Sequence, residues 1–186
     1  MNWTLKSFNE LTLSEFHDII QLRLDIFVVE QDCPYLDLDG KDQIAYHFFG
    51  RTDDGKTVAY TRLFGPDEYY KEAAIGRVVV HQDYRKDGLG FELMSKSIEK
   101  IELLYNTKTI KIGAQRYLRK FYESLGFEST GEDYMEDGIP HTYMIIKLPD
   151  TFINYPSSTY LGFLGKSNCT CNLNCQSPQP SGLTAL

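Results

Sequence analysis

Residues 75–93, IGRVVVHQDYRKDGLGFEL, decide the fold of this chain. The run from Ile75 to His81 is almost continuously apolar, as expected of a strand buried in the middle of a sheet. Two glycines then punctuate a turn, and Met94 and Ile101 afterwards fall on one face of a helix. The stretch therefore predicts a buried strand, a glycine-containing turn and a helix in direct succession.

The turn in this stretch, RKDGLG, has the features of an anion-binding site. Backbone amides at the start of a helix lack intrahelical partners, and the helix dipole adds about half a positive charge there. Gly88 and Gly90 would let a ligand approach the backbone without interference from a Cβ atom. We therefore predict a diphosphate cradle made by six consecutive residues: Arg85, Lys86, Asp87, Gly88, Leu89 and Gly90.

Spacing separates this turn from other glycine-rich phosphate loops. A Rossmann loop needs Gly-x-Gly-x-x-Gly directly after the strand, and a P-loop needs Gly-x-x-x-x-Gly-Lys-Ser/Thr. Neither fits residues 85–90, where the pattern is Arg-x-x-Gly-x-Gly. The alternative interpretation is a plain strand-turn-helix connection whose glycines serve only tight geometry.

The rest of the sequence predicts a mixed sheet with helices on its faces. Thr12 and Glu15 match a capping box, and apolar residues at helical spacing follow, so we expect a helix from about residue 13 to 30. Asp54-Gly55 and Asp137-Gly138 are typical turn sequences. We expect strands near residues 3–5, 44–50, 57–64, 75–81, 109–114, 127–131 and 141–148, and two further helices through 94–105 and 118–125.

Length and charge limit the class of protein. A chain of 186 residues can form one domain with a core, and its apolar runs are far shorter than the roughly 18 residues that span a bilayer. The N-terminal stretch lacks the apolar segment of a secretory signal, so we expect a soluble, cytoplasmic protein with no membrane partner. A net charge of −7 argues against a nucleic-acid partner. Residues 71–120 nevertheless hold 11 basic and 6 acidic side chains, which suggests a small polyanion unless the charges are scattered by chance.

The composition changes after residue 148, where Ser, Asn, Pro and Gly become frequent and the amphipathic period is lost. We predict one domain over residues 1–148 and a disordered tail over residues 149–186. The tail holds three cysteines, Cys169, Cys171 and Cys175. No histidine lies near them and structural zinc prefers four ligands, so we predict no metal site. Cys33 stands alone and is expected to be a small buried apolar residue rather than a nucleophile.

Two blocks of this sequence resemble the GCN5-related N-acetyltransferase (GNAT) superfamily. VVVHQDYRKDGLG, residues 78–90, resembles its acetyl-coenzyme A signature, in which the pyrophosphate loop follows Arg/Gln-x-x-Gly-x-Gly/Ala. GAQRYLRKFYESLGF, residues 113–127, resembles the strand and helix that end in Phe-Tyr-Glu-x-Leu-Gly-Phe. Four further blocks, LRLDIFVVEQDCPYLDLDGKD, IGRVVV, IGAQ and EDGIPHTYM, are similar to the ElaA-like acetyltransferases. The resemblance covers about residues 3–148.

The resemblance implies a fold and a cofactor site. The fold would be the α/β GNAT fold, a mixed and mostly antiparallel sheet that is splayed at its centre and flanked by helices. Acetyl-CoA would be the co-substrate, and no metal would take part. The pantetheine arm would pair with the strand edge at Val78, Val79 and Val80, as an added strand does. The pyrophosphate would lie on residues 85–90, and Gln115 on the opposing strand would complete the site.

The resemblance also suggests a catalytic acid and leaves the base open. Tyr122 matches the tyrosine that donates a proton to the leaving thiolate, because a phenol with a pKa of about 10 stays protonated at neutral pH. The alternative is an amphipathic core tyrosine. Glu30, His47 and His141 are candidate bases, and a water chain is a further option. The competing interpretations are a solvated helix-end carboxylate for Glu30, a buried hydrogen-bonded ring for His47 and an exposed ring for His141.

The acceptor is predicted to be a small-molecule or peptide amine. The stretch from Arg23 to Asp42 holds six acidic and two basic residues, which would attract a cationic amine unless it is an ordinary solvated loop. We therefore predict an acetyl-CoA-dependent N-acetyltransferase that acts by direct transfer, with a homodimer among the assemblies open to it. One alternative is a non-catalytic acyl-CoA-binding protein that acts through partners. Another is a metal-binding interaction protein built around the tail.

Overall fold

The structure is a computed structural model that describes residues 1–149, apart from the side chains of Lys86 and Asp87. The rest of the predicted tail lies outside the described residues. The same holds for its three cysteines, Cys169, Cys171 and Cys175. The disorder predicted there and the prediction that those cysteines hold no metal therefore stay predictions.

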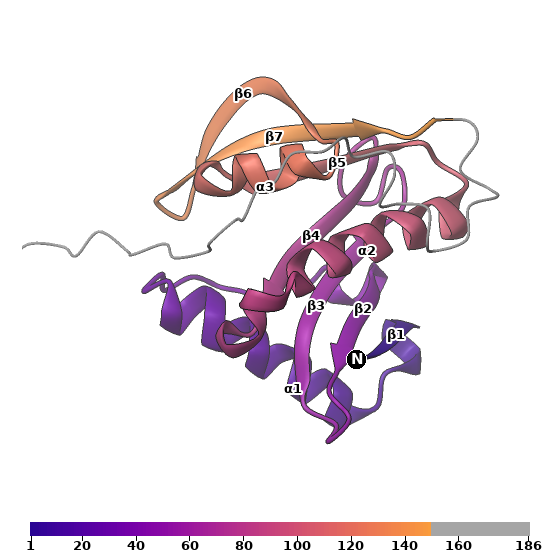
Figure 1. Cartoon of the computed structure of the whole chain (residues 1–186), viewed down its shortest axis with the longest axis vertical. Coiled ribbons are helices and arrows are strands. Elements are labelled where there is room, and N and C mark those ends of the chain that lie inside the picture. The colour runs from indigo at the N-terminus through magenta and orange to yellow at the C-terminus, as the bar shows by residue number, and fades with distance from the viewer. Residues whose placement is uncertain (150–186) are drawn as a thin grey trace, which may run out of the picture.

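A seven-stranded sheet runs through the whole of the described chain (Figure 1). Its spatial order is β1-β2-β3-β4-β5-β7-β6, and every neighbouring pair is antiparallel except β4 and β5, which are parallel. This confirms the predicted mixed, mostly antiparallel sheet. The strands are β1 (Asn2–Ser7), β2 (Tyr46–Arg51), β3 (Thr57–Phe64), β4 (Ala73–Val80), β5 (Thr109–Gln115), β6 (Glu128–Glu136) and β7 (Ile139–Lys147).

Helices cover both faces of the sheet. On one face, α1 (Leu13–Arg23) packs Ile19 and Leu22 against Phe49 and Tyr60. On the other face, α2 (Leu89–Tyr105) and α3 (Arg119–Ser124) enclose the larger core, to which β2 contributes Phe48. Because successive strand residues point to opposite faces, Phe48 packs in the larger core and its neighbour Phe49 packs under α1. The shorter helical segments are η1 (Phe8–Glu10), η2 (Leu24–Glu30), η3 (Asp42–Ile44), η4 (Gln82–Asp87) and η5 (Arg116–Leu118).

The first helix begins as predicted but changes type before its predicted end. The Thr12 hydroxyl accepts the amide of Glu15, and the Glu15 carboxylate accepts the amide of Thr12 at 2.8 Å, which confirms the capping box. The α-helix ends at Arg23, and η2 continues as a π-helix. The amide of Gln31, for example, bonds to the carbonyl five residues earlier. A period of 3.6 in the apolar residues cannot reveal this change from an α-helix to a π-helix. Short π-helical segments are frequent at functional sites.

The sheet is split between β4 and β5. These strands pair only at Ala73 with Ile110 and at Ala74 with Lys111. On its other side, β4 slips in register against β3 around Arg77, whose φ of 51° marks a bulge that bends the strand. Figure 1 shows β5–β7 running at a wide angle to β2–β4. The predicted splay at the centre of the sheet is therefore confirmed.

A buried ion network fixes the loop between η2 and β2. Arg23, which is fully buried, donates to Asp37 at 2.8 Å and to Asp42 at 2.6 Å. Arg62 of β3 lies 3.2 Å from Asp42, and Arg77 in the bulge donates to Asp37 at 2.7 Å. The network holds the bulge and the loop together. It also neutralises carboxylates that the sequence suggested would attract a cationic acceptor.

Replacing Arg23 by Met is expected to destabilise the fold by about 3 kcal/mol, because it leaves buried Asp37 and Asp42 short of a partner. Urea unfolding measures this change. Arg119→Met is the matched control, because its pair with Glu123 is exposed and is worth less than about 1 kcal/mol. Equal stability of the two variants would contradict a stabilising role for the buried network.

The effect of Arg23→Met is also expected to depend on pH. Burial raises the pKa of Asp37, but the charges of Arg23 and Arg77 and the Tyr35 hydroxyl outweigh burial and hold this pKa below its ordinary value. A carboxyl whose pKa is depressed by folding stabilises the protein above its unfolded pKa of about 3.9, and this contribution is lost as the pH falls through the folded value. The stability difference between the wild type and the variant should therefore shrink below about pH 4.

Candidate active site

The predicted phosphate cradle lies where η4 meets α2. Gly88 precedes α2 with a φ of 72°, a left-handed conformation that favours glycine. Its carbonyl accepts the amides of Phe91 and Glu92 at 3.0 and 3.1 Å, so the amides before Phe91 precede the regular helical bonding. A Cβ atom at Gly88 would have no heavy atom within 4 Å and would point into open space. The backbone here can therefore be approached by a ligand.

Gly90 separates the functional interpretation of the turn from the geometric one. A Cβ atom at this position would lie 3.7 Å from Phe121 and 3.9 Å from Val80, which are ordinary van der Waals distances. The protein's own packing therefore leaves room for a Cβ atom at residue 90. Tight geometry explains Gly88 but does not explain Gly90, which is compatible with the predicted close approach of a ligand to the backbone.

Arg85 links the cradle to the end of η2. Its Nε donates to the carbonyl of Val80 at 2.9 Å, and its two terminal nitrogens bind the carboxylate of Glu30 at 2.6 and 2.9 Å. Glu30 is thus placed at the predicted cradle and balances the charge of Arg85. One of the backbone groups predicted to pair with pantetheine, the Val80 carbonyl, already has a protein donor.

The strand edge predicted to bind pantetheine faces the split in the sheet. Beyond Ala74, β4 has no ladder partner in β5 within the described chain. Val79 pairs with Tyr60 of β3 and packs its side chain toward α1, whereas Val78 and Val80 pack against the larger core. The side of β4 that faces β5 can therefore take an added extended chain.

Tyr122 lies in the core that also contains Leu89 of the predicted cradle. It is 5% exposed and belongs to the same packed cluster as Leu89, the first residue of α2. Its ring meets the ring of Phe121 edge-on at 5.1 Å. Burial, with a contribution from Tyr117, raises the pKa of the Tyr122 phenol. The hydroxyl therefore keeps its proton at neutral pH, as a general acid must.

His47 is held in the protein interior. It has no exposed surface, Nδ1 lies 2.8 Å from the Tyr60 hydroxyl, and Nε2 lies 2.9 Å from the Asp42 carbonyl. Burial lowers the pKa of His47, so the ring is neutral. Both ring nitrogens have protein partners and no substrate can reach them. The geometry therefore argues against the predicted catalytic role of His47 and favours the alternative of a hydrogen-bonded core residue.

The segment after η2 contacts both halves of the split sheet. Besides the pair between Glu30 and Arg85, the side-chain amide of Gln115 at the end of β5 donates to the side-chain oxygen of Gln31 at 3.2 Å. The thiol of Cys33 donates to the carbonyl of Asp137 in the β6–β7 turn at 3.4 Å. Cys33 is thus half-buried and hydrogen-bonded, which corrects the expectation of a buried apolar residue. Gln115 lies beside the split, as the cofactor prediction requires.

A second group of side chains, not predicted from the sequence, meets over Gly113 of β5. A Cβ atom there would collide with the hydroxyl of Tyr134 and lie 3.4 Å from the hydroxyl of Tyr70. Tyr134 stacks on Tyr143 at 4.4 Å and on His141 at 5.4 Å. The sequence signal for this group is the alternation of His141 and Tyr143, which places both on one face of β7, but alternation does not show which residues lie opposite.

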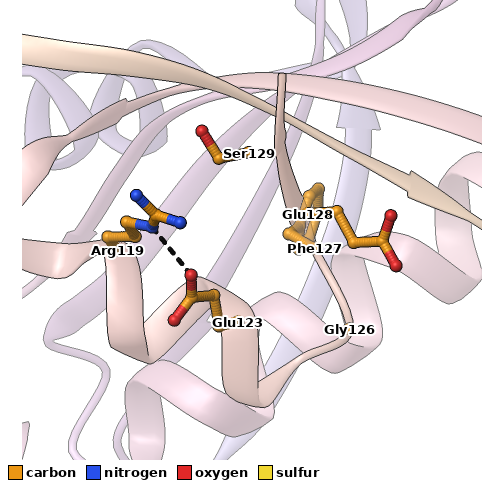
Figure 2. Close-up of a pocket in the computed structure, with 6 residues that line it drawn as sticks. All are labelled: Arg119, Glu123, Gly126, Phe127, Glu128 and Ser129. Atoms are coloured by element: carbon orange, nitrogen blue, oxygen red, sulfur yellow. Dashed lines mark hydrogen bonds and ion pairs between the residues drawn. The ribbon is translucent and has the colours of Figure 1, made fainter. Parts of the chain in front are cut away.

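A surface pocket lies between α3 and β6, and Figure 2 shows the ion pair of Arg119 and Glu123 along its edge. None of the predicted site residues lines it, so it is separate from the candidate active site. Its lining residues are Arg119, Glu123, Gly126, Phe127, Glu128 and Ser129.

Two features of other protein classes are missing from the described part of the chain. In residues 1–149, no group of three or more His, Cys, Asp or Glu side chains is arranged to hold a metal ion. No helix of these residues has both the length and the apolar character that a membrane crossing requires.

The split sheet and the glycine-containing start of α2 are what the resemblance to the GNAT class implies. The model of the acetyltransferase (GNAT) domain family matches residues 28–148, and the chain belongs to this family. Within the family, the chain is 40% identical to protein ElaA of Escherichia coli over 146 residues, which cover 77% of this chain and 95% of ElaA. The predicted resemblance to the ElaA-like acetyltransferases is therefore confirmed.

Other relatives agree with this placement. A UPF0039 protein of Synechocystis is 39% identical over 149 residues, covering 80% of this chain and 97% of the relative. The crystal structure of E. coli ElaA superimposes with a TM-score of 0.73 at 38% identity. An acyl-CoA N-acyltransferase from Pseudomonas aeruginosa gives the same values, and each comparison covers 78% of this chain and 99% of the other. The fold and the family thus support acyl transfer in general.

Proposed function

We propose that the protein is an acetyl-CoA-dependent N-acetyltransferase that transfers the acetyl group directly to an amine. One observation carries the proposal: β4 and β5 part beside the glycine-containing start of α2, and the buried phenol of Tyr122 lies in the same core. A long, doubly phosphorylated thioester needs an anion site, an extended strand edge and a proton donor. Residues 85–90, Val78–Val80 and Tyr122 would supply them.

Binding would use backbone groups more than side chains. The amides of residues 85–90 would hold the pyrophosphate at the positive end of α2. The edge of Val78–Val80, apart from the Val80 carbonyl that Arg85 already occupies, would pair with the amides of the pantetheine arm. Gln115, across the split, would face the same arm from β5. Arg85 would add positive charge to the cradle, and its ion pair with Glu30 would reduce that contribution.

Acetyl-CoA supplies the acetyl thioester. A backbone amide of Val78–Val80 would polarise the carbonyl. The lone pair of the amine forms the new N–C bond as the C–S bond breaks, and Tyr122 gives its proton to the departing sulfur. The nitrogen loses its surplus protons, one of which restores Tyr122. Starting from an ammonium ion, the balance is an N-acetyl amine, free CoA thiol and one released proton.

The test is acetyl-CoA binding by calorimetry together with thiol release in a broad panel of small-molecule and peptide amines. We expect binding without any amine and thiol release only when an acceptor is present. Binding without thiol release for the whole panel would favour the non-catalytic acyl-CoA-binding alternative. No binding at all would contradict both.

Replacing Glu30 by Gln is expected to strengthen acetyl-CoA binding about two- to fivefold, because it removes a negative charge from Arg85 at the cradle. Turnover at saturating substrates should stay unchanged. The control is Glu99→Gln, which makes the same charge change on an exposed part of α2. A large loss of turnover in Glu30→Gln would instead identify Glu30 as the catalytic base.

A further inference from the structure

We propose that Arg77 is a positioning residue: its guanidinium, held by Asp37, fixes the bulge in β4 and so orients the amide of Val78 toward the split in the sheet. This inference rests on the proposed function, in which a backbone amide of this edge polarises the thioester carbonyl. It adds the two side chains that hold that amide in place. The pair acts through the backbone and contacts no reacting atom.

The bulge is one extra residue in β4. This strand advances three residues between Gly76 and Val79, whereas their partners in β3 advance only two. Thr61 of β3 therefore lies opposite both Arg77 and Val78, which is the arrangement of a bulge in an antiparallel pair.

The bulge exchanges the faces of β4. Before it, Ala73 and Ile75 lie in the larger core, and after it Val78 and Val80 pack there. The side chains that face this core thus change from odd-numbered to even-numbered residues. Without the extra residue, every residue from 78 onward would present the opposite face and the opposite edge.

The direction of the Val78 amide follows from one backbone hydrogen bond. The amide of His81 donates to the carbonyl of Val58 in β3 at 2.8 Å. Because the backbone groups of successive strand residues point to alternate edges, those of Val80 and Val78 point away from β3 and toward the split. The guanidinium of Arg85 reaches the Val80 carbonyl on this side, which agrees with the assignment.

The backbone conformation of Arg77 is unusual for its residue type. Its φ is 51°, and within residues 1–149 it is the one non-glycine residue that has a positive φ inside a strand. The first residue of a bulge with this conformation is typically a glycine, because a side chain is disfavoured there. An arginine at this position therefore needs contacts that hold it in place.

Asp37 supplies those contacts. The Nε atom of Arg77 donates to the Asp37 carboxylate at 2.7 Å, and a terminal nitrogen donates to the main-chain carbonyl of Asp37 at 3.1 Å. The Asp37 side chain is fully buried. Its carboxylate also accepts Nε of Arg23 at 2.8 Å and the Tyr35 hydroxyl at 2.7 Å. Arg77 is thus bound at two points to a residue that is itself fixed on several sides.

The pair therefore restricts the peptide group that carries the Val78 amide. That peptide group directly follows Arg77, so the dihedral angles of Arg77 orient it. A glycine at this position can adopt the same φ, but it can also adopt many others. Arginine with its bound partner removes this freedom, and a hydrogen-bond donor is effective in catalysis when it is oriented before the reaction begins.

The first test uses acetyl-CoA labelled with ¹³C at the thioester carbonyl and needs no amine acceptor. On binding to the wild type, the infrared band of the labelled carbonyl is expected to move to lower frequency, because a hydrogen-bond donor weakens the C=O bond. Arg77→Gly is expected to lose roughly half of this shift or more. Its affinity for acetyl-CoA in calorimetry should change less than about threefold, since the cradle and the strand edge remain.

Asn106→Gly is the matched control. Asn106 follows the last residue of α2 with a φ of 48°, so the control introduces glycine into the same kind of backbone conformation outside β4. Its carbonyl band should match that of the wild type. Thermal unfolding of both variants reports the shared effect of glycine on stability.

Kinetics with an amine that accepts the acetyl group provide the second test. Arg77→Gly should lower kcat about 30-fold and leave KM for acetyl-CoA unchanged. Arg77→Lys keeps the charge but loses the two-point contact, so its kcat and its carbonyl shift should lie between those of the wild type and Arg77→Gly. Free guanidinium ion at millimolar concentration should restore part of the kcat of Arg77→Gly, which a role in folding alone would not produce.

The outcomes separate this inference from the proposed function. A carbonyl shift and a kcat equal to those of the wild type in Arg77→Gly would overturn the role of Arg77. If that variant does not fold, a full wild-type shift in Arg77→Lys would overturn it instead. Binding of acetyl-CoA to the wild type without any carbonyl shift would contradict this inference and leave the cofactor site standing. No binding at all would contradict the proposed function, and the inference with it.

Discussion

The Gly88→Glu variant is expected to bind acetyl-CoA at least about 100-fold more weakly than the wild type, a loss of about 2.8 kcal/mol. Gly88 has a φ of 72° and open space where a side chain would begin. The new carboxylate would therefore enter the predicted cradle, where its charge would repel the diphosphate. Isothermal titration calorimetry with acetyl-CoA measures the loss. An unchanged affinity would remove residues 85–90 from the cofactor site.

Gly55→Glu is a matched control for this experiment. Gly55, in the turn between β2 and β3, has a φ of 88°, and a Cβ atom added there would have no heavy atom within 4 Å. The control introduces the same charge into the same kind of backbone conformation, away from the cradle. Thermal unfolding of both variants reports the shared cost of a side chain in a left-handed conformation. A loss of affinity confined to Gly88→Glu is then a property of the cradle.

The Tyr122→Phe variant is expected to lower kcat about 100-fold while the affinity for acetyl-CoA stays the same. The change removes one oxygen from a ring that packs in the core, so the fold should hold. Steady-state kinetics and calorimetry separate the two quantities. A turnover number equal to that of the wild type would remove Tyr122 from the mechanism and leave it as the core tyrosine of the alternative interpretation.

The pH profile of the wild type gives an independent check on Tyr122. Burial raises the pKa of this phenol above its ordinary value of about 10. A general acid with a raised pKa stays protonated over a wider alkaline range. Wild-type kcat should therefore show no fall from ionisation of Tyr122 below about pH 10. A clear alkaline fall between about pH 8 and about pH 10 that Tyr122→Phe abolishes would contradict the burial argument.

Local signals predicted most of the fold. The capping box of Thr12 and Glu15 indicated the start of the first helix, and the glycines at 55, 126 and 138 marked turns where φ is positive. Strand positions were predicted to within a few residues, but β6 extends to Glu136 where the sequence suggested residue 131. That strand carries many exposed polar side chains, so alternating hydrophobicity does not define its end.

The parts of the site that sequence reasoning missed depend on distant contacts. Arg85 and Glu30 are 55 residues apart in the chain, and the side-chain amide of Gln115 reaches the side chain of Gln31 across 84 residues. No periodicity in one segment shows such a pair. His47 and His141 were both candidate bases from their sequence contexts, and only the structure shows that both ring nitrogens of His47 have hydrogen-bond partners in the protein.

The separation of β4 from β5 leaves an opening in the sheet beyond their last ladder pair. Strands joined by a continuous hydrogen-bond ladder leave no opening between them, whereas these two strands share only two ladder pairs. If the proposed function holds, an acetyl-CoA along the edge of β4 and its acceptor would meet through this opening.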